Sequence, residues 1–410
     1  MADDALHQIV RLGAQGDGVA DGPDGDLFVP GILPGETARR TGDNSWSFVG
    51  APSPHRRPIP LCPHVAACGG CRVQHMSDDL YRTWKSSLLV QALAMGGLSV
   101  RPDPMLSVPL GSRRRATFGG VWEDGRVELG FHGPSSHTLE RITACAVLLP
   151  EVVDALPVLE AIAQRVSARS TAPRVTVLAA DNGLDVAIEG RALAAGKIDL
   201  AEIAKTARRA RIVRITVGGA PFLMLEPPVV RFGGVDVSPP PGAFLQATRA
   251  TDEVLAGLVM TGIGKARRVA DLFAGLGTLS LPMASQARVL AVDSDPDLLK
   301  ALGDGVARAQ GLKPVDRLRR DLFRDPLSPR ELDAFDAVVL DPPRAGASTQ
   351  SAALVRSKVK RVVMVSCNPG TLQRDLATLV GGGFRLERAV AIDQFLFTPH
   401  LEAVAVLSRR

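Results

Sequence analysis

The sequence is poor in aromatic residues and in lysine, and it lacks any long apolar run. Only 4% of its 410 residues are aromatic and Tyr81 is the single tyrosine, so an extended platform for stacking bases is not expected. No apolar run approaches the ~20 residues of a membrane span. The acidic start Met1-Ala2-Asp3-Asp4 also lacks the apolar segment of a secretory signal. These absences predict a cytoplasmic protein with no membrane partner.

The charge balance is slightly basic and is carried mostly by arginine. Lysine and arginine total 48 against 43 acidic residues, a net charge of +5. Such a bias indicates a polyanionic partner, because guanidinium groups can grip phosphate as a planar fork. A solvated, arginine-rich surface would give the same composition, so composition alone leaves both interpretations open.

The length predicts two or three domains, since one core rarely serves more than roughly 250 residues. Residues 1–55 contain short apolar bursts between glycine turns, which predict a small β-barrel. Residues 56–240 are predicted to be β-rich, with hairpin turns at Glu123-Asp124-Gly125-Arg126 and Asp181-Asn182-Gly183. Residues 241–410 alternate strands with helices, which predicts an α/β, doubly wound, Rossmann-like sheet.

The predicted strands of this last segment end in residues that can do chemistry. The strands are Arg268–Phe273, Val289–Asp293, Ala337–Asp341 and Val362–Ser366, with helices over Pro296–Leu312 and Thr371–Val380. Ligands of such sheets bind at the carboxyl ends of the strands. Asp271, Asp293, Asp341 and Cys367 all fall at or near such an end.

A glycine-containing loop, Asp271-Leu272-Phe273-Ala274-Gly275-Leu276-Gly277-Thr278-Leu279-Ser280, follows the first of these strands. Its glycines let the backbone approach a ligand closely, but Ser280 stands where a dinucleotide fingerprint needs a third glycine. Asp293 ends the next strand, where a carboxylate can bind the hydroxyl pair of a ribose. The pattern favours an S-adenosylmethionine site over a dinucleotide site, and a purely structural turn stays an alternative.

Cys367 lies in Ser366-Cys367-Asn368-Pro369, a setting that predicts a partly exposed thiol. A nearby helix N-terminus is expected to lower its pKa. A thiolate that adds to carbon 6 of a uracil makes carbon 5 nucleophilic toward a methyl donor. A base must then remove the carbon 5 proton, and Glu402, just before the last predicted strand, offers a carboxylate. An inert, buried cysteine is the alternative.

The motifs Asp-Leu-Phe-Ala-Gly-Leu-Gly, Asp-Pro-Pro-Arg, Ser-Cys-Asn-Pro and His-Leu-Glu occur in this order along the chain. Together they resemble the RNA (uracil-5-)-methyltransferase family, most of all its bacterial 23S ribosomal RNA members. The resemblance implies methyl transfer from S-adenosylmethionine to carbon 5 of a uridine in structured RNA, 23S rRNA or tRNA. It also implies that Cys367 is the nucleophile and Glu402 the base. The residues that it implies as donor or substrate contacts are Gln246, Phe273, Asp293, Asp321 and Asp341, with Thr278 where many members have asparagine.

The other four cysteines form Cys62-x5-Cys68-x2-Cys71 with a distant Cys145. Four thiolates can hold an iron–sulfur cluster or a tetrahedral zinc ion. Zinc usually takes two close cysteine pairs, so the spacing favours iron–sulfur and leaves zinc open. The family resemblance implies a [4Fe-4S] cluster, for which a structural role is expected.

The resemblance further implies that residues 1–55 form a TRAM domain, an OB-like barrel that binds RNA. Arg113-Arg114-Arg115 is a candidate phosphate grip, although a strand edge protected by charge would look the same. A monomer is expected. An RNA-binding iron–sulfur protein with a vestigial methyltransferase domain remains the alternative from another functional class.

Overall fold

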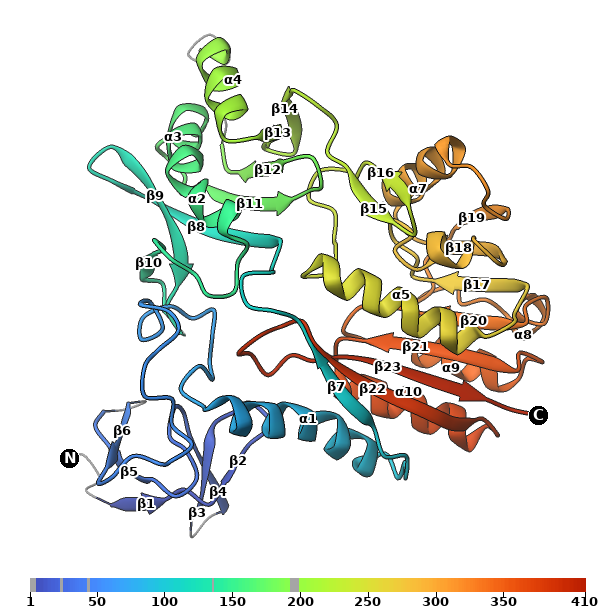
Figure 1. Ribbon diagram of the computed structural model, residues 1–410, viewed down its shortest axis with the longest axis horizontal. Helices are drawn as coiled ribbons and strands as arrows, with labels where there is room; N and C mark the ends of the chain where they lie inside the picture. The colour runs from blue at the N-terminus through green and yellow to red at the C-terminus, as the bar shows by residue number, and fades with distance from the viewer. Residues whose placement is uncertain (1–4, 23–24, 43–44, 135, 192–198) are drawn as a thin grey trace.

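The computed structural model describes residues 5–22, 25–42, 45–134, 136–191 and 199–410. Figure 1 shows three parts: short N-terminal strands at the lower left, a twisted sheet above them, and a large sheet with helices on the right. Within the described residues, no helix combines the length and the apolar character needed to cross a membrane.

The N-terminal part consists of short strands in two three-stranded sheets. One holds β1 (Leu6–Gln8), β5 (Thr37–Arg40) and β6 (Trp46–Val49), and the other β2 (Arg11–Leu12), β3 (Gly18–Gly22) and β4 (Gly25–Val29). A small core that includes Ile9, Val29 and Ile32 supports them. The TRAM assignment for this part stays a prediction.

The central part is a seven-stranded sheet that packs against helices. Its order is β10 (Leu139–Arg141), β9 (Arg126–His132), β8 (Arg115–Glu123), β11 (Arg174–Ala179), β12 (Leu184–Glu189), β13 (Ile212–Val217) and β14 (Ala220–Met224). The helices are α2 (Pro150–Asp154), α3 (Leu156–Val166) and α4 (Leu200–Arg209). The two predicted hairpins are confirmed, and Gly125 and Gly183 at their turns have φ of 77° and 152°, which only glycine adopts easily. Beyond this sheet, β15 (Val230–Phe232) and β16 (Val235–Val237) form a separate hairpin.

The C-terminal part is an eight-stranded sheet with the predicted alternation of strands and helices. Its order is β19 (Val315–Arg319), β18 (Arg288–Asp293), β17 (Arg268–Leu272), β20 (Ala337–Leu340), β21 (Arg361–Ser366), β23 (Glu402–Ser408), β22 (Arg385–Asp393) and β7 (Asp103–Ser107). The first five are parallel, and β23 runs antiparallel between β21 and β22. The parallel strands therefore deliver their carboxyl ends to one edge, as predicted.

Both faces of this sheet are buried, because successive side chains of a strand point to opposite sides. In β20, Val338 and Leu340 join one apolar core while Ala337 and Val339 join another. The helices of this part are α5 (Arg249–Ile263), α6 (Ser280–Met283), α7 (Pro296–Arg308), α8 (Pro329–Leu332), α9 (Ser348–Val355) and α10 (Pro369–Gly381). A sheet buried on both faces is a rigid platform for the loops at its edge.

One segment from before the central sheet belongs with the C-terminal sheet. Helix α1 (Asp78–Met95), capped by Ser77, packs against α10 and β22 and buries Tyr81 and Trp84. The following strand β7 pairs in parallel with β22. Residues 78–107 thus lie on the C-terminal sheet, although they fall within the predicted central domain of residues 56–240. Helix α1 therefore fastens the preceding cysteine segment to that sheet.

Candidate active site and cysteine cavity

A cavity of about 450 Å³ opens at the carboxyl ends of the parallel strands. We refer to it as the strand-end cavity. All eight residues predicted to bind the donor or to catalyse the reaction line it, namely Gln246, Phe273, Thr278, Asp293, Asp321, Asp341, Cys367 and Glu402. The fold thus brings together residues that lie up to 156 positions apart in the chain (402 minus 246), while their chemical roles stay predictions.

The glycine loop is shaped by backbone conformations that most residues avoid. Gly277 has φ of 85°, and a Cβ there would lie 2.4 Å from a methyl carbon of Leu302. Phe273 adopts a left-handed φ of 65° although it is not glycine, a strained conformation of the kind found at functional sites. The Gly275 amide donates to Asp293 Oδ2 at 2.8 Å, which ties the loop to the end of β18.

Aromatic and acidic groups form the walls of this cavity. The rings of Phe273 and Phe323 lie 5.4 Å apart between centroids, and about half of Phe323 is exposed. Asp271 is buried, accepts a hydrogen bond from the Ser280 hydroxyl, and has no partner for Oδ1 among the described residues. Burial raises the pKa of Asp271 to about 7.

Cys367 follows β21 and is half-buried. Burial raises the pKa of its thiol to about 11, and the carboxylates of Glu402 and Asp341 act in the same direction, with Arg344 opposing them. The expectation of a lowered pKa is therefore wrong. The N-terminus of α10 is outweighed by desolvation and by two nearby negative charges.

Glu402, which is buried, and Asp341, which is partly exposed, form an acidic pair that lines the cavity. Burial and the neighbouring Asp341 raise the pKa of Glu402 well above its usual value, and burial raises that of Asp341 to about 7. Glu402 is 2% exposed. Its Oε2 accepts a hydrogen bond from Gln394, whereas Oε1 has no partner among the described residues. A carboxyl with a raised pKa is suited to proton transfer near neutral pH.

Sequence reasoning missed Gln394, which follows β22 and is 1% exposed. Its amide nitrogen donates to Gln246 Oε1 at 2.7 Å and to Glu402 Oε2 at 2.8 Å. The one available signal was its position directly after a strand, which it shares with Cys367 and Asp341.

Arg114 has a structural task rather than the predicted phosphate grip. It is 2% exposed, pairs with Asp252 at 2.7 Å, and donates from Nε to the carbonyl of Gln246 at 3.1 Å. A phosphate cannot reach Arg114, because its side chain is buried. Arg113 and Arg115 instead line a second cavity.

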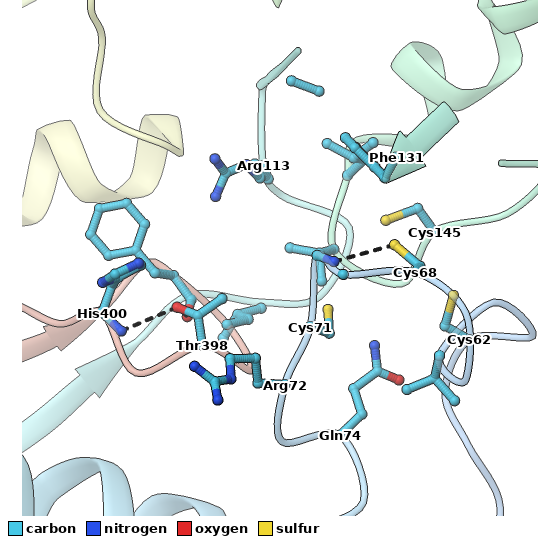
Figure 2. A pocket seen from close by; sticks show the side chains of 18 of the residues that line it. Cys62, Cys68, Cys71, Arg72, Gln74, Arg113, Phe131, Cys145, Thr398 and His400 are labelled. Carbon is cyan, nitrogen blue, oxygen red and sulfur yellow. Dashed lines mark hydrogen bonds between the residues drawn. The ribbon is translucent and has the colours of Figure 1, made fainter. Parts of the chain in front are cut away.

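The second cavity, of about 610 Å³, is lined by residues from all three parts of the chain, and we call it the cysteine cavity. Figure 2 shows Cys62, Cys68, Cys71 and Cys145 around it, and all four are free thiols. The thiol pKa of Cys71 is raised to about 11 by burial, and then by the other three sulfurs. Such mutual influence requires the four thiols to lie near one another.

The thiols are not gathered tightly enough for a single small ion. Among the described residues, no three His, Cys, Asp or Glu side chains are placed to hold one metal ion. A tetrahedral zinc ion with Zn–S bonds of about 2.3 Å would bring its sulfurs within about 3.8 Å of each other.

The two cavities are neighbours. Arg344, Phe395 and His400 line both, and a nitrogen of Arg344 lies 3.2 Å from His400 Nε2. The amides of Arg72 and Val73, next to Cys71, donate to the carbonyl of Phe397 at 2.8 and 3.2 Å. The segment between β22 and β23 therefore forms a wall that both cavities share. Backbone hydrogen bonds from the segment that follows Cys71 hold this wall in place.

Comparison with known proteins identifies relatives along the whole chain. The family model described as tRNA (Uracil-5-)-methyltransferase matches residues 320–410. An "Uncharacterized RNA methyltransferase" of Brucella suis is 44% identical, with 98% of this chain and 97% of that protein covered. The 23S rRNA (uracil(1939)-C(5))-methyltransferase RlmD of Edwardsiella ictaluri is 34% identical over 96% of this chain and 93% of its own length.

A solved structure shares the fold. The tRNA (uracil-54, C5)-methyltransferase of Pyrococcus abyssi, in complex with S-adenosyl-L-homocysteine, superposes with a TM-score of 0.75. It covers 98% of this chain and 100% of the archaeal chain at 22% identity. At that identity the likeness concerns the fold alone.

Proposed function

Because this chain belongs to the RNA (uracil-5-)-methyltransferase family and is an S-adenosylmethionine-dependent RNA methyltransferase, we propose that it methylates carbon 5 of one uridine in 23S rRNA through a covalent adduct. The observation that carries the proposal is the strand-end cavity, in which Cys367, Glu402 and Asp341 meet the glycine loop. Among the named relatives, the similarity to a 23S rRNA enzyme over nearly the full length favours rRNA as the substrate.

The cavity residues fit the donor by their chemistry. Asp293 at the end of β18 and the Phe273–Phe323 pair offer a carboxylate for ribose hydroxyls and an aromatic wall for a base. When bound, S-adenosylmethionine supplies an electrophilic methyl group beside a positive sulfonium. We assign to Asp341 and Gln246 the task of positioning the donor and the target base relative to each other.

Cys367 is the proposed nucleophile. Its sulfur adds to carbon 6 of the uracil, the electron pair of the C5–C6 bond moves toward the carbon 4 carbonyl, and carbon 5 becomes able to take the methyl group. The thiol must first lose its proton, which passes to water because the sulfur is only half-buried. Its raised pKa means that it is protonated in the free protein at neutral pH. The thiolate is therefore expected to form only once substrates fill the cavity and change its charge balance.

Glu402 is the proposed base. After methyl transfer carbon 5 carries both a methyl group and a proton. Glu402, once ionised, takes that proton at its unpartnered Oε1, the C5–C6 double bond re-forms, and the bond from carbon 6 to sulfur breaks with its electron pair returning to Cys367. Burial excludes water from this carboxylate, so the proton has a defined acceptor.

We further propose that Cys62, Cys68, Cys71 and Cys145 hold a [4Fe-4S] cluster. The support for this assignment is chemical: four free thiols, the ligand type of such clusters, line one cavity. The cluster would join the segment before α1 to the central sheet near Cys145, a structural task. Cytoplasmic location, a monomeric state and RNA binding by residues 1–55 stay predictions.

The same chemistry on tRNA is the second candidate, because the family model that matches residues 320–410 is described for tRNA. Mapping 5-methyluridine in total RNA from a strain that lacks this gene distinguishes the two. A mark lost from 23S rRNA supports the proposal, and a mark lost from tRNA replaces it. If no 5-methyluridine disappears from either RNA, the proposed reaction is refuted.

A further inference from the structure

Gln394 uses every polar atom of its side chain within the strand-end cavity network. Its Nε2 donates to Gln246 Oε1 at 2.7 Å and to Glu402 Oε2 at 2.8 Å, and its Oε1 accepts from the Ala247 amide at 2.8 Å. A primary amide has two N–H groups and one carbonyl oxygen. The side chain is therefore fully committed, and at 1% exposure it cannot turn toward water.

For Glu402 this contact distinguishes two otherwise equivalent oxygens. Oε2 is held by Gln394, and Oε1 is buried with no partner among the described residues. Leaving a buried carboxylate oxygen unpaired costs free energy. An unpaired oxygen at this position is explained if it accepts a proton during the reaction.

For Gln246 the contact fixes which way its amide points. Gln394 occupies Gln246 Oε1, so the amide nitrogen must face away, where it lies 3.5 Å from Asp341 Oδ2. The backbone around Gln246 is held as well, by Arg114 at its carbonyl and by Gln394 at the next amide. The amide of Gln246 thus presents donors, not its oxygen, to Asp341.

We propose that Gln394 is a positioning residue that reserves Glu402 Oε1 as the proton acceptor and orients the Gln246 amide toward Asp341. This inference rests on the proposed function, since it assigns Gln394 to the step that releases the methylated base. Gln394 itself is not among the residues that line the strand-end cavity. It acts through Glu402 and Gln246.

The surroundings of Glu402 determine the sign of the expected pH effect. The titratable and charged groups near it are Asp341 after β20, Cys367 after β21, Asp393 with its partners Lys85 and Tyr81 from α1, and Arg344 and His400 at the cavity mouth. Burial and Asp341 raise the pKa of Glu402, and the Gln394 hydrogen bond lowers it. Removing that bond therefore raises the pKa further, and the base becomes active only at higher pH.

The test compares Gln394→Met with the matched control Gln350→Met. Gln350 is also 1% exposed and also holds two backbone hydrogen bonds, to Leu327, but it lines neither cavity. Total RNA from the deletion strain, grown with uracil tritiated at carbon 5, serves as the substrate. Tritium release measures proton abstraction, and denaturing gels detect the covalent protein–RNA adduct.

In Gln394→Met, tritium release is expected to fall by about tenfold to a hundredfold, the loss of a hydrogen bond to a charged group. The acidic limb of its pH profile should move up by about one unit, and the adduct should accumulate. Gln350→Met should keep the wild-type limb and form no excess adduct, even if it unfolds at a lower temperature.

The outcomes separate the two proposals. Wild-type tritium release with an unchanged limb in Gln394→Met overturns the role of Gln394 and leaves the proposed function standing, whereas absence of tritium release in wild type sinks the proposed function itself. If Gln394→Met does not fold, Gln394→Glu takes its place, because it keeps the shape and an acceptor for the Ala247 amide. As a carboxylate it adds negative charge beside Glu402, so a limb that stays in place in this variant also overturns the inference.

Discussion

The two cavities hold the same side chain in two different settings. In the cysteine cavity, Cys71 has three other thiols as neighbours, and in the strand-end cavity Cys367 faces the carboxylates of Glu402 and Asp341. Burial raises the pKa of both thiols to about 11. Burial therefore cannot be what gives them different roles.

The difference lies in the partner that can relieve the cost of ionisation. When four thiols around one space bind a metal centre, each releases its proton to solvent and binds the metal as a thiolate. A single thiol beside carboxylates gains from a cationic donor and from a substrate carbon that accepts its electron pair. On the proposed roles, the neighbours of each sulfur, more than the cysteine itself, distinguish binding from catalysis.

The largest expected effect is the loss of methylation when the proposed nucleophile, Cys367, is removed. Cys367→Ala should lower methylation on the order of a thousandfold or more, as expected when a covalent nucleophile is removed. It should keep its iron and its RNA affinity, because it leaves the cysteine cavity intact. Counting 5-methyluridine formed on RNA from the deletion strain, with iron content and filter binding in parallel, checks this. Normal turnover in this variant would refute the nucleophile assignment.

The next effect tests the carboxylate that distinguishes the strand-end cavity. Glu402→Gln should slow turnover by roughly 10²–10⁴-fold, the usual contribution of a general base. Sulfur addition and methyl transfer are still possible, so a covalent protein–RNA adduct should accumulate on denaturing gels. Absence of any adduct, with turnover equally low, would count against Glu402 as the base.

A variant in the cysteine cavity should show the opposite pattern, with a large effect on metal content and a small effect on activity. Cys145→Ala should lose nearly all iron and labile sulfide and lower the Tm by roughly 5–10 °C, because a metal centre that joins distant segments stabilises the fold. Methylation should fall only about tenfold, through the wall that the cavities share. Absorption spectra and iron analysis measure this. Stoichiometric zinc in the wild-type protein would contradict the cluster assignment.

How far local sequence predicts such a site depends on the range of the interactions. The parallel strands β17, β18, β20 and β21 and the residues at their ends were predictable, because apolar runs and glycine turns are local patterns that place side chains at one edge. Cys367 and Asp341 share a cavity for that reason. Strands β19, β22 and β7 of the same sheet were not predicted.

Long-range features could not be predicted in this way. The Ser77 cap and the apolar spacing of α1 could have indicated a helix, but no local pattern states that it packs on a sheet formed by residues 268–408. Arg114 looked like one of three exposed arginines, and only the fold reveals its buried partner Asp252. The raised pKa of Cys367 has the same origin, since it depends on residues 26 and 35 positions away (367 minus 341, 402 minus 367).

The smallest expected effect is a change in the pH dependence of stability, caused by the buried carboxyl of Asp271 in the strand-end cavity. The residues that line the cysteine cavity include no carboxyl. Burial raises the pKa of Asp271 from 3.8 to about 7. Between these values the folded protein holds a proton that the unfolded chain has released, so stability is greatest at the acidic end and falls as pH rises toward 7. Asp271→Asn removes this titration and can keep an acceptor for the Ser280 hydroxyl. The drop in Tm between about pH 5 and pH 8 should therefore shrink by roughly 4 °C.

The matched control is Asp375→Asn, a buried carboxylate whose oxygens pair with Arg374 and the Ala347 amide. It should lose stability at both pH values, since asparagine cannot replace a charge-assisted pair. If the Tm of wild type and of Asp271→Asn depends equally on pH, then Asp271 does not have a raised pKa. Glu402 and Asp341 would then be the carboxyls with a raised pKa that distinguish the strand-end cavity from the cysteine cavity.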